Sequence, residues 1–350
     1  MKTIAIISFT GNGAIINRRL REALSGRDRI LSSFHKSSRP EEDLTNIEDS
    51  LAVWTETHFS QADALIFIGA CGIAVRAIAP CLSGKWEDPA VLVIDEKAAY
   101  CISLLSGHAG GANRLTEEVS AILGAQAVIT TATDRNGLFS VDSFALSNQL
   151  CLTDPELAKL ISADLLAGEC VGFFSDLKLS GETALPKELL FNHSCRRNIV
   201  VSLRPSMQPD TLTLIPRIVH IGIGCRKGCP SEEIRKAISA ALGRAGVHPR
   251  AIADLSSIDR KAEEEGILKT ARELELPFRT FTAAELAAVP GSFEESDFVS
   301  AVTGVGNVCE RAACAASGGG TILLAKTNFD GVTIALACEE RILSFGPEVV

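Results

Sequence analysis

A strand–loop–helix–strand unit over residues 98–134 constrains this chain more than any other feature. An apolar run leads into a glycine-rich stretch, Ser106 to Asn113, and then into apolar residues at helical spacing. Gly124 follows where a left-handed helix cap is needed, and a second apolar run covers residues 126–130. Such units cross over right-handedly, so both strands point the same way. The pattern predicts an α/β fold with two parallel strands here.

The loops after these two strands carry side chains that can do chemistry. His108 lies in the first loop, and Thr131, Thr133 and Asp134 lie in the second. Parallel strands end at one edge of a sheet, where open α/β sheets bind ligands. His108 can act as a base, an acid or a hydrogen-bond donor near neutral pH. Two alternatives stay open, because His108 can be a solvated loop residue and Asp134 can simply cap the next element of the chain.

The glycine-rich stretch also offers backbone donors. Glycines let a ligand approach the main chain, and the free N–H groups of a helix start attract carboxylate or phosphate. We therefore expect Gly107, Gly110, Gly111 and Asn113 to contact a polar ligand. The alternative is that these glycines only make a tight turn.

The same theme recurs along the chain and divides it into parts. Residues 1–135 alternate strand and helix, which predicts a parallel sheet covered on both faces. Residues 136–210 have a weaker pattern and are interpreted as a small α+β middle segment that ends in a linker. Residues 211–350 resume the alternation, with a further strand expected at Phe298 to Val302. We predict two parallel-sheet α/β domains joined by the middle segment.

Three more loops are candidate binding sites. They follow apolar runs, as the first loop does, and they carry glycines, cations or both; the candidates are Gly72, Arg226, Lys227, Gly304, Gly306, Asn307 and Glu310. Cys309 stands where a dinucleotide fingerprint has its third glycine, so a nicotinamide or flavin role is disfavoured. Cys225 and Cys229 lack the second pair that a zinc site needs. Glu310 can equally be an ordinary carboxylate of a first helical turn.

Composition excludes other classes of function. The formal net charge is −9 and the pI is near 5.3, so a basic face for non-specific nucleic-acid binding is not expected. No apolar stretch reaches membrane-spanning length, and the start Met1-Lys2-Thr3 does not resemble a signal peptide. Eleven scattered cysteines are typical of reduced thiols. We expect a cytoplasmic protein without a bound metal, whose oligomeric state the sequence leaves open.

Taken together, these segments resemble the cobalt-precorrin-5A hydrolase family of anaerobic cobalamin biosynthesis. Residues 106–113 and 128–134 resemble its amino-terminal signature, and Gly222 to Gly228 resembles the start of its carboxy-terminal domain. The run from Gly304 to Lys326 adds to this likeness. The resemblance covers residues 1–145 and 217–340 and leaves the middle segment without a signal.

The resemblance implies that water opens a lactone on a cobalt-tetrapyrrole. A two-carbon bridge then leaves as acetaldehyde, which gives the ring-contracted cobalt-precorrin-5B. The resemblance does not fix the catalytic roles. Our own hypothesis is that His108 activates water, that Asp134 orients it or shares its proton, and that the Gly110 and Gly111 amides hold the oxyanion or a peripheral carboxylate. The cobalt belongs to the substrate and no cofactor is expected. Other enzymes of the pathway are candidate partners.

Three rival functions remain open at this point. The first is a non-catalytic tetrapyrrole-binding or carrier protein of the same pathway. The second is a nucleotide-dependent α/β enzyme, and the third is a methyltransferase that also binds tetrapyrroles. Ligand-induced shifts in melting temperature would separate them, because a ligand that binds the native state stabilises it.

Overall fold

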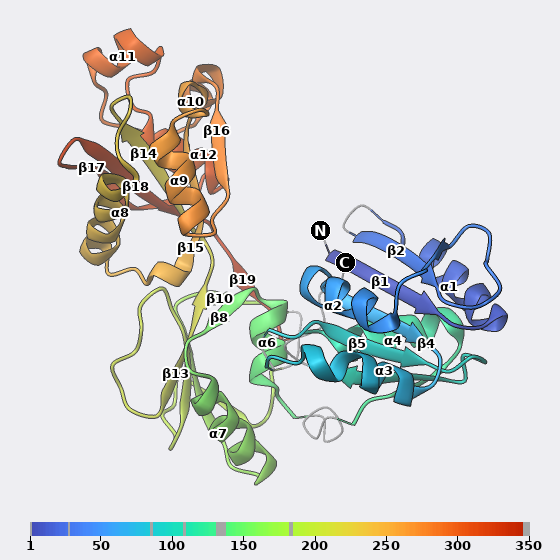
Figure 1. Ribbon diagram of the computed structural model, residues 1–350. Helices are drawn as coiled ribbons and strands as arrows, with labels where there is room; N and C mark the ends of the chain where they lie inside the picture. The colour runs from blue at the N-terminus through green and yellow to red at the C-terminus, as the bar shows by residue number, and fades with distance from the viewer. Residues whose placement is uncertain are drawn as a thin grey trace. The chain divides into compact units, whose positions relative to one another are not determined.

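The α/β prediction is confirmed by a computed structural model, which describes residues 2–26, 29–84, 87–107, 110–130, 138–181 and 185–345 (Figure 1). Contacts divide the chain into two units, Met1–Leu146 and Ser147–Val350. In the described residues the first unit contains a seven-stranded sheet, and the second contains two five-stranded sheets and a short two-stranded one. None of the described helices combines the length and the apolar character that a bilayer crossing needs.

The sheet of the first unit has the strand order β3-β2-β1-β4-β5-β6-β7. Its strands are β1 (Lys2–Ser8), β2 (Arg29–His35), β3 (Thr45–Asn46), β4 (Ala64–Ile68), β5 (Ala90–Ile94), β6 (Tyr100–Leu105) and β7 (Gln126–Val128). The helices around it are α1 (Gly11–Leu24), α2 (Leu51–Gln61), α3 (Cys71–Ile78), the 3-10 turn η1 (Ala79–Cys81) and α4 (Ala112–Leu123). Residues such as Leu20 and Val119 bury α1 and α4 on one face, and Trp54 and Ala74 bury α2 and α3 on the other.

This first sheet is mixed rather than wholly parallel, which corrects the prediction. β1, β2, β3, β4 and β5 run parallel, whereas β6 pairs antiparallel with β5. The cause is the short β5–β6 connection, residues 95–99, since a parallel pair needs a crossover of about a dozen residues or more. The Asp95 carboxylate accepts the Lys97 and Tyr100 amides and closes this turn. The predicted parallel β6–α4–β7 unit is confirmed, as is the left-handed Gly124 cap.

The middle of the chain forms a five-stranded sheet with the order β11-β9-β12-β13-β8. It contains β8 (Leu150–Leu152), β9 (Val171–Ser175), β11 (Leu189–Phe191), β12 (Asn198–Val201) and β13 (Thr211–Pro216), with α6 (Val141–Ser147) and α7 (Pro155–Leu166). The stretch expected to be a linker, residues 204–210, connects two neighbouring strands of this sheet, β12 and β13. By strand pairing the chain leaves the middle sheet at Arg217 rather than at residue 210. The predicted division into three domains otherwise stays a prediction.

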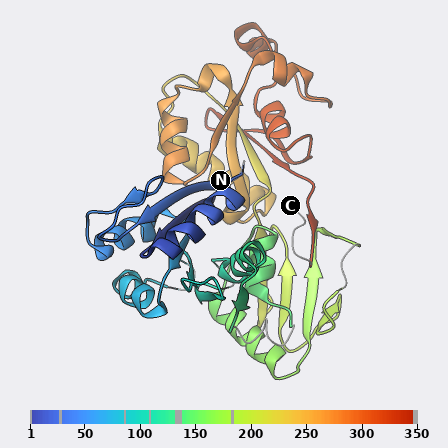
Figure 2. The ribbon, with the colours of Figure 1, turned by 90° about the vertical axis from the view of Figure 1, so that its right-hand side faces the viewer.

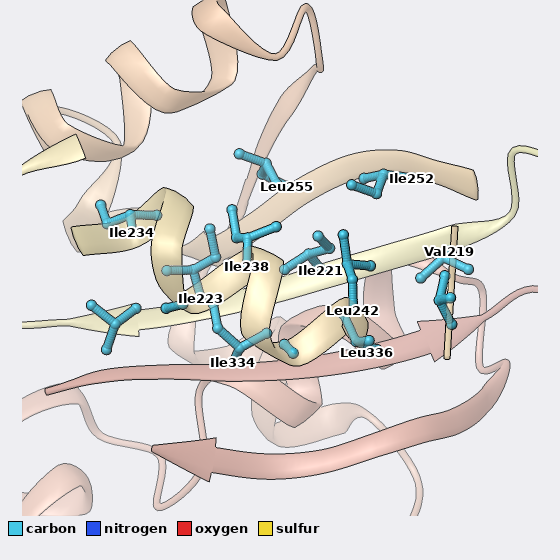
Figure 3. Close-up of a cluster of buried hydrophobic side chains, with 14 of the residues drawn as sticks. Val219, Ile221, Ile223, Ile234, Ile238, Leu242, Ile252, Leu255, Ile334 and Leu336 are labelled. Carbon is cyan, nitrogen blue, oxygen red and sulfur yellow. The ribbon is translucent and has the colours of Figure 1, made fainter. Parts of the chain in front are cut away.

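The carboxy-terminal sheet has the order β16-β15-β14-β18-β17. Its elements are β14 (Val219–Cys225), α8 (Ser231–Ala245), η2 (Pro249–Ala251), β15 (Ile252–Ile258), η3 (Asp259–Lys261), α9 (Glu265–Glu273), β16 (Phe278–Phe281), α10 (Ala283–Ala288), α11 (Asp297–Thr303), α12 (Cys309–Ala316), β17 (Thr321–Phe329) and β18 (Val332–Cys338). Figure 3 shows Ile234, Ile238 and Leu242 of α8 directed at the aliphatic side chains of β14, β15 and β18. Asp330 and Gly331, both at positive φ, make the predicted hairpin turn between β17 and β18.

Residues Phe298 to Val302 are helical, which corrects the strand prediction. They lie within α11, where the Ser296 hydroxyl accepts the Val299 amide as an N-cap. Gly304 then ends the helix with φ of 83°. This apolar run is too short for its pattern to distinguish a helix from a strand, and the two caps make it a helix.

After β18 the chain returns to the middle sheet. The short strand β19 (Ile342–Leu343) pairs in parallel with β10 (Lys178–Leu179), next to the strands of the middle sheet (Figure 2). We call residues 339–345 the carboxy-terminal strap. The middle sheet is therefore connected to the carboxy-terminal sheet twice, at Arg217 and through this strap.

Candidate active site

The glycine-rich loop between β6 and α4 is closed by its own backbone. Ser106 has φ of +55°, which turns its carbonyl toward the start of the helix, where it accepts the Gly110 and Ala112 amides at 3.1 Å each. The Asn113 amide donates to the Gly107 carbonyl at 3.0 Å. The loop is thus fixed on both sides of His108, which itself lies outside the described residues.

The glycines of this loop are required for different reasons. A β-carbon on Gly107 would lie 2.7 Å from Asn113 Oδ1, and one on Gly110 would lie 2.5 Å from the β-carbon of Ser106 and 3.1 Å from the Ala90 nitrogen. Gly111 caps α4 with φ of 80°, a conformation that side chains rarely adopt. Close packing therefore explains Gly107 and Gly110, and backbone conformation explains Gly111, without any ligand.

The two predicted amide donors differ. The Gly110 amide donates to the Ser106 carbonyl within the loop at 3.1 Å, and its contact with a ligand stays a prediction. The Gly111 amide has no acceptor among the described residues. The Gly111 amide is thus an open backbone donor before α4 that can serve an oxyanion or a carboxylate.

Parallel pairing brings the loops after β6 and β7 to one edge of the sheet. Tyr100 pairs with Gln126 and Ile102 with Val128, so the loops that follow the two strands leave the sheet at the same edge, as predicted. Thr131, Thr133 and Asp134, which follow β7, lie outside the described residues. The structure thus establishes the common edge, and the juxtaposition of His108 with Asp134 stays a prediction.

Gly72 lies at the other edge of the sheet. It follows β4, which runs parallel to β5, and the neighbouring Gly69 amide donates to Ile94 at the carboxyl end of β5. Gly110 instead packs against Ala90 at the amino end of β5. Five residues of strand, about 13 Å, separate the two ends. The antiparallel turn into β6 therefore places Gly72 and the β6–α4 loop at opposite edges of the sheet, and contact of Gly72 with a ligand stays a prediction.

The loop after β14 presents the two predicted cations to solvent. Arg226 has a 72% exposed side chain and lies 3.5 Å from Glu233, and Lys227 is also exposed. The Gly228 amide and Lys261 Nζ each donate to the buried Glu264 carboxylate at 2.7 Å. Burial opposes ionisation of Glu264, but these two hydrogen bonds together with the charges of Lys261 and Lys227 outweigh it and lower its pKa. The buried Glu264 carboxylate therefore holds the loop in place, while the exposed Arg226 and Lys227 stay available to an anionic ligand.

The loop before α12 is a buried structural network. Asn307 is fully buried; its Oδ1 accepts the Glu310 amide at 3.0 Å and its Nδ2 donates to the Glu294 carbonyl and to Glu310 Oε2. Glu310 Oε1 accepts the Lys326 amide at 2.6 Å. A β-carbon on Gly306 would overlap the Glu295 carboxylate. Asn307 and Glu310 therefore connect α12 to β17, which explains them without a ligand.

Sequence reasoning missed a cluster of polar side chains at the amino end of β14. His220 Nδ1 lies 3.0 Å from Asp254 Oδ1 and its Nε2 lies 3.5 Å from Glu339, with the His220 and Asp254 side chains each 6% exposed. Asp254 in turn lies 3.3 Å from Arg279. The sequence signal that could have revealed this cluster is the alternation of polar with apolar residues in strands that are buried on both faces. This cluster lies on the side of the sheet that α12 covers. Through Glu339 it contacts the first residue of the carboxy-terminal strap.

Ser103 was also missed. Its hydroxyl donates to Asn113 Oδ1 at 2.6 Å, directly below the glycine-rich loop. Asn113 itself is 8% exposed and is bonded to the strand and to the loop at once. A serine within an apolar strand carries no local sign that it contacts a residue ten positions later.

Comparison with known proteins covers both units. Family models described as Cobalamin synthesis G N-terminal and Cobalamin synthesis G C-terminus match residues 53–134 and 219–337. The cobalt-precorrin-5A hydrolase of Salmonella typhimurium is 36% identical over 348 residues, which covers 96% of this chain and 97% of that relative. The enzyme of the same name from Priestia megaterium is 31% identical, with 95% and 94% covered.

A solved cobalamin biosynthesis protein G homologue from Sulfolobus solfataricus is 26% identical over 97% of both chains, with a TM-score of 0.40. The two hydrolase matches extend through the middle segment, for which the sequence alone offered no resemblance. On these matches, the chain belongs to the cobalamin synthesis G family, which includes the cobalt-precorrin-5A hydrolases.

Proposed function

We propose that this chain is a cobalt-precorrin-5A hydrolase. Water adds to the lactone carbonyl of the cobalt-tetrapyrrole and the ring C–O bond breaks, which leaves a carboxylate and a hydroxyl group. The two-carbon bridge then leaves as acetaldehyde, which gives cobalt-precorrin-5B. The near full-length likeness to two enzymes of this name carries the proposal.

Within this proposal the loop between β6 and α4 is the reaction site. His108 takes a proton from the attacking water, and Asp134, from the loop after the parallel strand β7, orients the imidazole or shares its proton. The open Gly111 amide receives the developing oxyanion. Arg226 and Lys227 bind carboxylates of the substrate, since their exposed charges are available.

The carbon–carbon cleavage needs an electron sink, which the conjugated macrocycle supplies. The protein's own residues then have only to bind the substrate, exclude competing water and move protons. Independence from an organic cofactor and a cytoplasmic location accordingly stay predictions. Other enzymes of the pathway remain candidate partners for substrate transfer.

The test is acetaldehyde release from cobalt-precorrin-5A, with detection of a product that is lighter by the two-carbon unit. His108→Ala and Asp134→Asn, each checked for native folding, are expected to reduce turnover by about a hundredfold or more. His193→Ala, an exposed histidine of the middle segment, is the matched control and should retain normal turnover. Normal turnover in both site variants would remove these residues from the mechanism, and binding of substrate without any acetaldehyde would favour a carrier.

A further inference from the structure

His220 lies between two carboxylates that belong to different parts of the second unit. Its Nδ1 is 3.0 Å from Asp254 Oδ1 in β15, and its Nε2 is 3.5 Å from Glu339 Oε2, at the start of the carboxy-terminal strap. The His220 and Asp254 side chains are almost fully buried, so the protein rather than water must satisfy them. One imidazole therefore joins the carboxy-terminal sheet to the first residue of the strap.

A neutral imidazole cannot donate to both carboxylates. It has one N–H donor, and its other nitrogen is an acceptor, as every ionised carboxylate oxygen is. If the single proton is on Nδ1 and faces Asp254, then Nε2 and Glu339 Oε2 are two acceptors that face each other. Both ring nitrogens and Asp254 Oδ1 are buried without an aligned hydrogen bond among the described residues. One additional proton between Nε2 and Glu339 would give both carboxylates a donor.

Two arginines beside these carboxylates cannot take the place of that proton. Arg279 of β16 lies 3.3 Å from Asp254 Oδ2, and the Arg341 guanidinium pairs with Glu339 Oε1. Each arginine thus contacts one oxygen of its carboxylate and leaves the other oxygen to His220. Both guanidinium groups stay charged over the pH range in which histidines titrate. The contact of His220 with both carboxylates therefore depends on a proton that the arginines do not supply.

Two thiols also lie near the imidazole, and neither of them titrates in that range. Cys338 comes directly before Glu339. Cys314 of α12 packs in one cluster with Ala337, the strand partner of His220. Burial raises the pKa of both thiols above their ordinary value, so both are neutral between about pH 5 and 8. Proton uptake at this position therefore falls to His220 and its two carboxylates.

We propose that His220 is a pH-dependent switch for the start of the carboxy-terminal strap. When the additional proton is bound, at about pH 5.5, the imidazole donates to Asp254 and Glu339 and holds the strap on the sheet. When the proton is lost, at about pH 8.5, two acceptors face each other and the start of the strap loosens. The closed form binds more protons than the loosened one, so its stability falls as the pH rises. Further along, the strap pairs with β10 and bonds to Asn148, and these contacts do not involve the proton.

Hydrogen exchange of two strap amides tests the switch. The Glu339 amide donates to the Ile218 carbonyl at 3.0 Å. The Ser344 amide, at the far end of the strap, donates to Asn148 Oδ1. Protection factors correct for the effect of pH on exchange itself and report on each amide separately. We expect the protection factor of the Glu339 amide to fall about tenfold from pH 5.5 to pH 8.5, and that of the Ser344 amide to change less than about twofold.

Two variants of the contact and one control identify the group responsible. His220→Gln has no titratable ring, so protection of the Glu339 amide should be the same at both pH values. Glu339→Gln supplies an NH2 group that can donate to a neutral Nε2, so protection at pH 8.5 should stay near the wild-type level at pH 5.5. His193→Gln, at an exposed histidine of the middle segment, should keep the wild-type pH dependence.

Equal protection of the wild-type Glu339 amide at the two pH values would overturn the switch. So would a wild-type pH dependence in His220→Gln, or in Glu339→Gln if the first variant does not fold. A parallel loss of protection at Ser344 would also overturn it, because the whole strap rather than its start would then respond to pH. No substrate enters the measurement, so its outcome is independent of the proposed function.

Discussion

Asn148 and Ser344 exchange two hydrogen bonds although 196 positions separate them in the sequence. Asn148 Nδ2 donates to the Ser344 carbonyl at 2.9 Å, and the Ser344 amide donates to Asn148 Oδ1 at 2.8 Å. Beside this pair the Phe345 ring lies 5.4 Å from that of Phe173, which is fully buried. The carboxy-terminal strap therefore completes the core of the middle sheet.

Asn148→Ala should loosen the middle sheet through the strap. It removes both bonds and leaves the Ser344 backbone groups without this partner, for an expected loss of about 1–3 kcal/mol in the free energy of unfolding. Urea denaturation and hydrogen exchange of the β9 amides measure this loss. Gln208→Ala, an exposed amide in the loop between β12 and β13, is the control. Wild-type stability in Asn148→Ala would show that the strap is dispensable.

Gly110→Ala should damage the candidate active site sterically. The new β-carbon would meet the β-carbon of Ser106 at 2.5 Å and the backbone nitrogen of Ala90 at 3.1 Å, so the loop must shift away from the sheet. We expect acetaldehyde release to fall by about tenfold or more, since displacement by about 1 Å slows catalysis strongly. Gly243→Ala, in α8 with open space around it, should instead be neutral or slightly stabilising. Unchanged turnover in Gly110→Ala would mean that the loop is not the site.

Glu310→Gln should affect stability rather than substrate affinity. The carboxylate accepts the Lys326 amide and the Asn307 NH2 group, so an amide in its place would direct its own NH2 at one of these donors. An unmatched buried donor costs about 1–3 kcal/mol, which denaturant unfolding measures. KM for the folded fraction should stay near the wild-type value. A large rise in KM with normal stability would instead support the substrate contact that the sequence suggested for Glu310.

The sequence sufficed where local pattern and chemistry agree. The β6–α4–β7 unit, the Gly124 cap and the turn at Asp330 all follow from residues close in the chain. The length of the 95–99 connection is also a local signal, because so short a link makes β6 antiparallel to β5. Periodicity alone could not show whether Phe298 to Val302 is a strand or a helix, because the caps at Ser296 and Gly304 decide its structure.

Long-range pairs explain what was missed at the candidate site. The glycines of the loop were predicted as ligand contacts, yet Gly107 and Gly110 are also required by packing against Asn113 and Ser106. Ser103 can donate its hydroxyl to Asn113 only when β6 and α4 fold against each other. Strap contacts such as Asn148 with Ser344 have no local signature at all, because each residue is unremarkable among its neighbours.

Thiol reactivity should distinguish buried cysteines from exposed ones in the native protein. Burial raises the pKa of Cys101, Cys225 and Cys309 to about 11 each, whereas Cys170 is exposed. The thiolate is the reactive form, so at pH 8 only about one in a thousand of these buried groups is ionised, and the fraction rises as the pH approaches 11. Alkylation at pH 8 followed by mass spectrometry should therefore label Cys170 first and spare the other three until guanidinium unfolds the chain. Rapid labelling of Cys309 in the native protein would contradict its burial in α12, where it is 2% exposed.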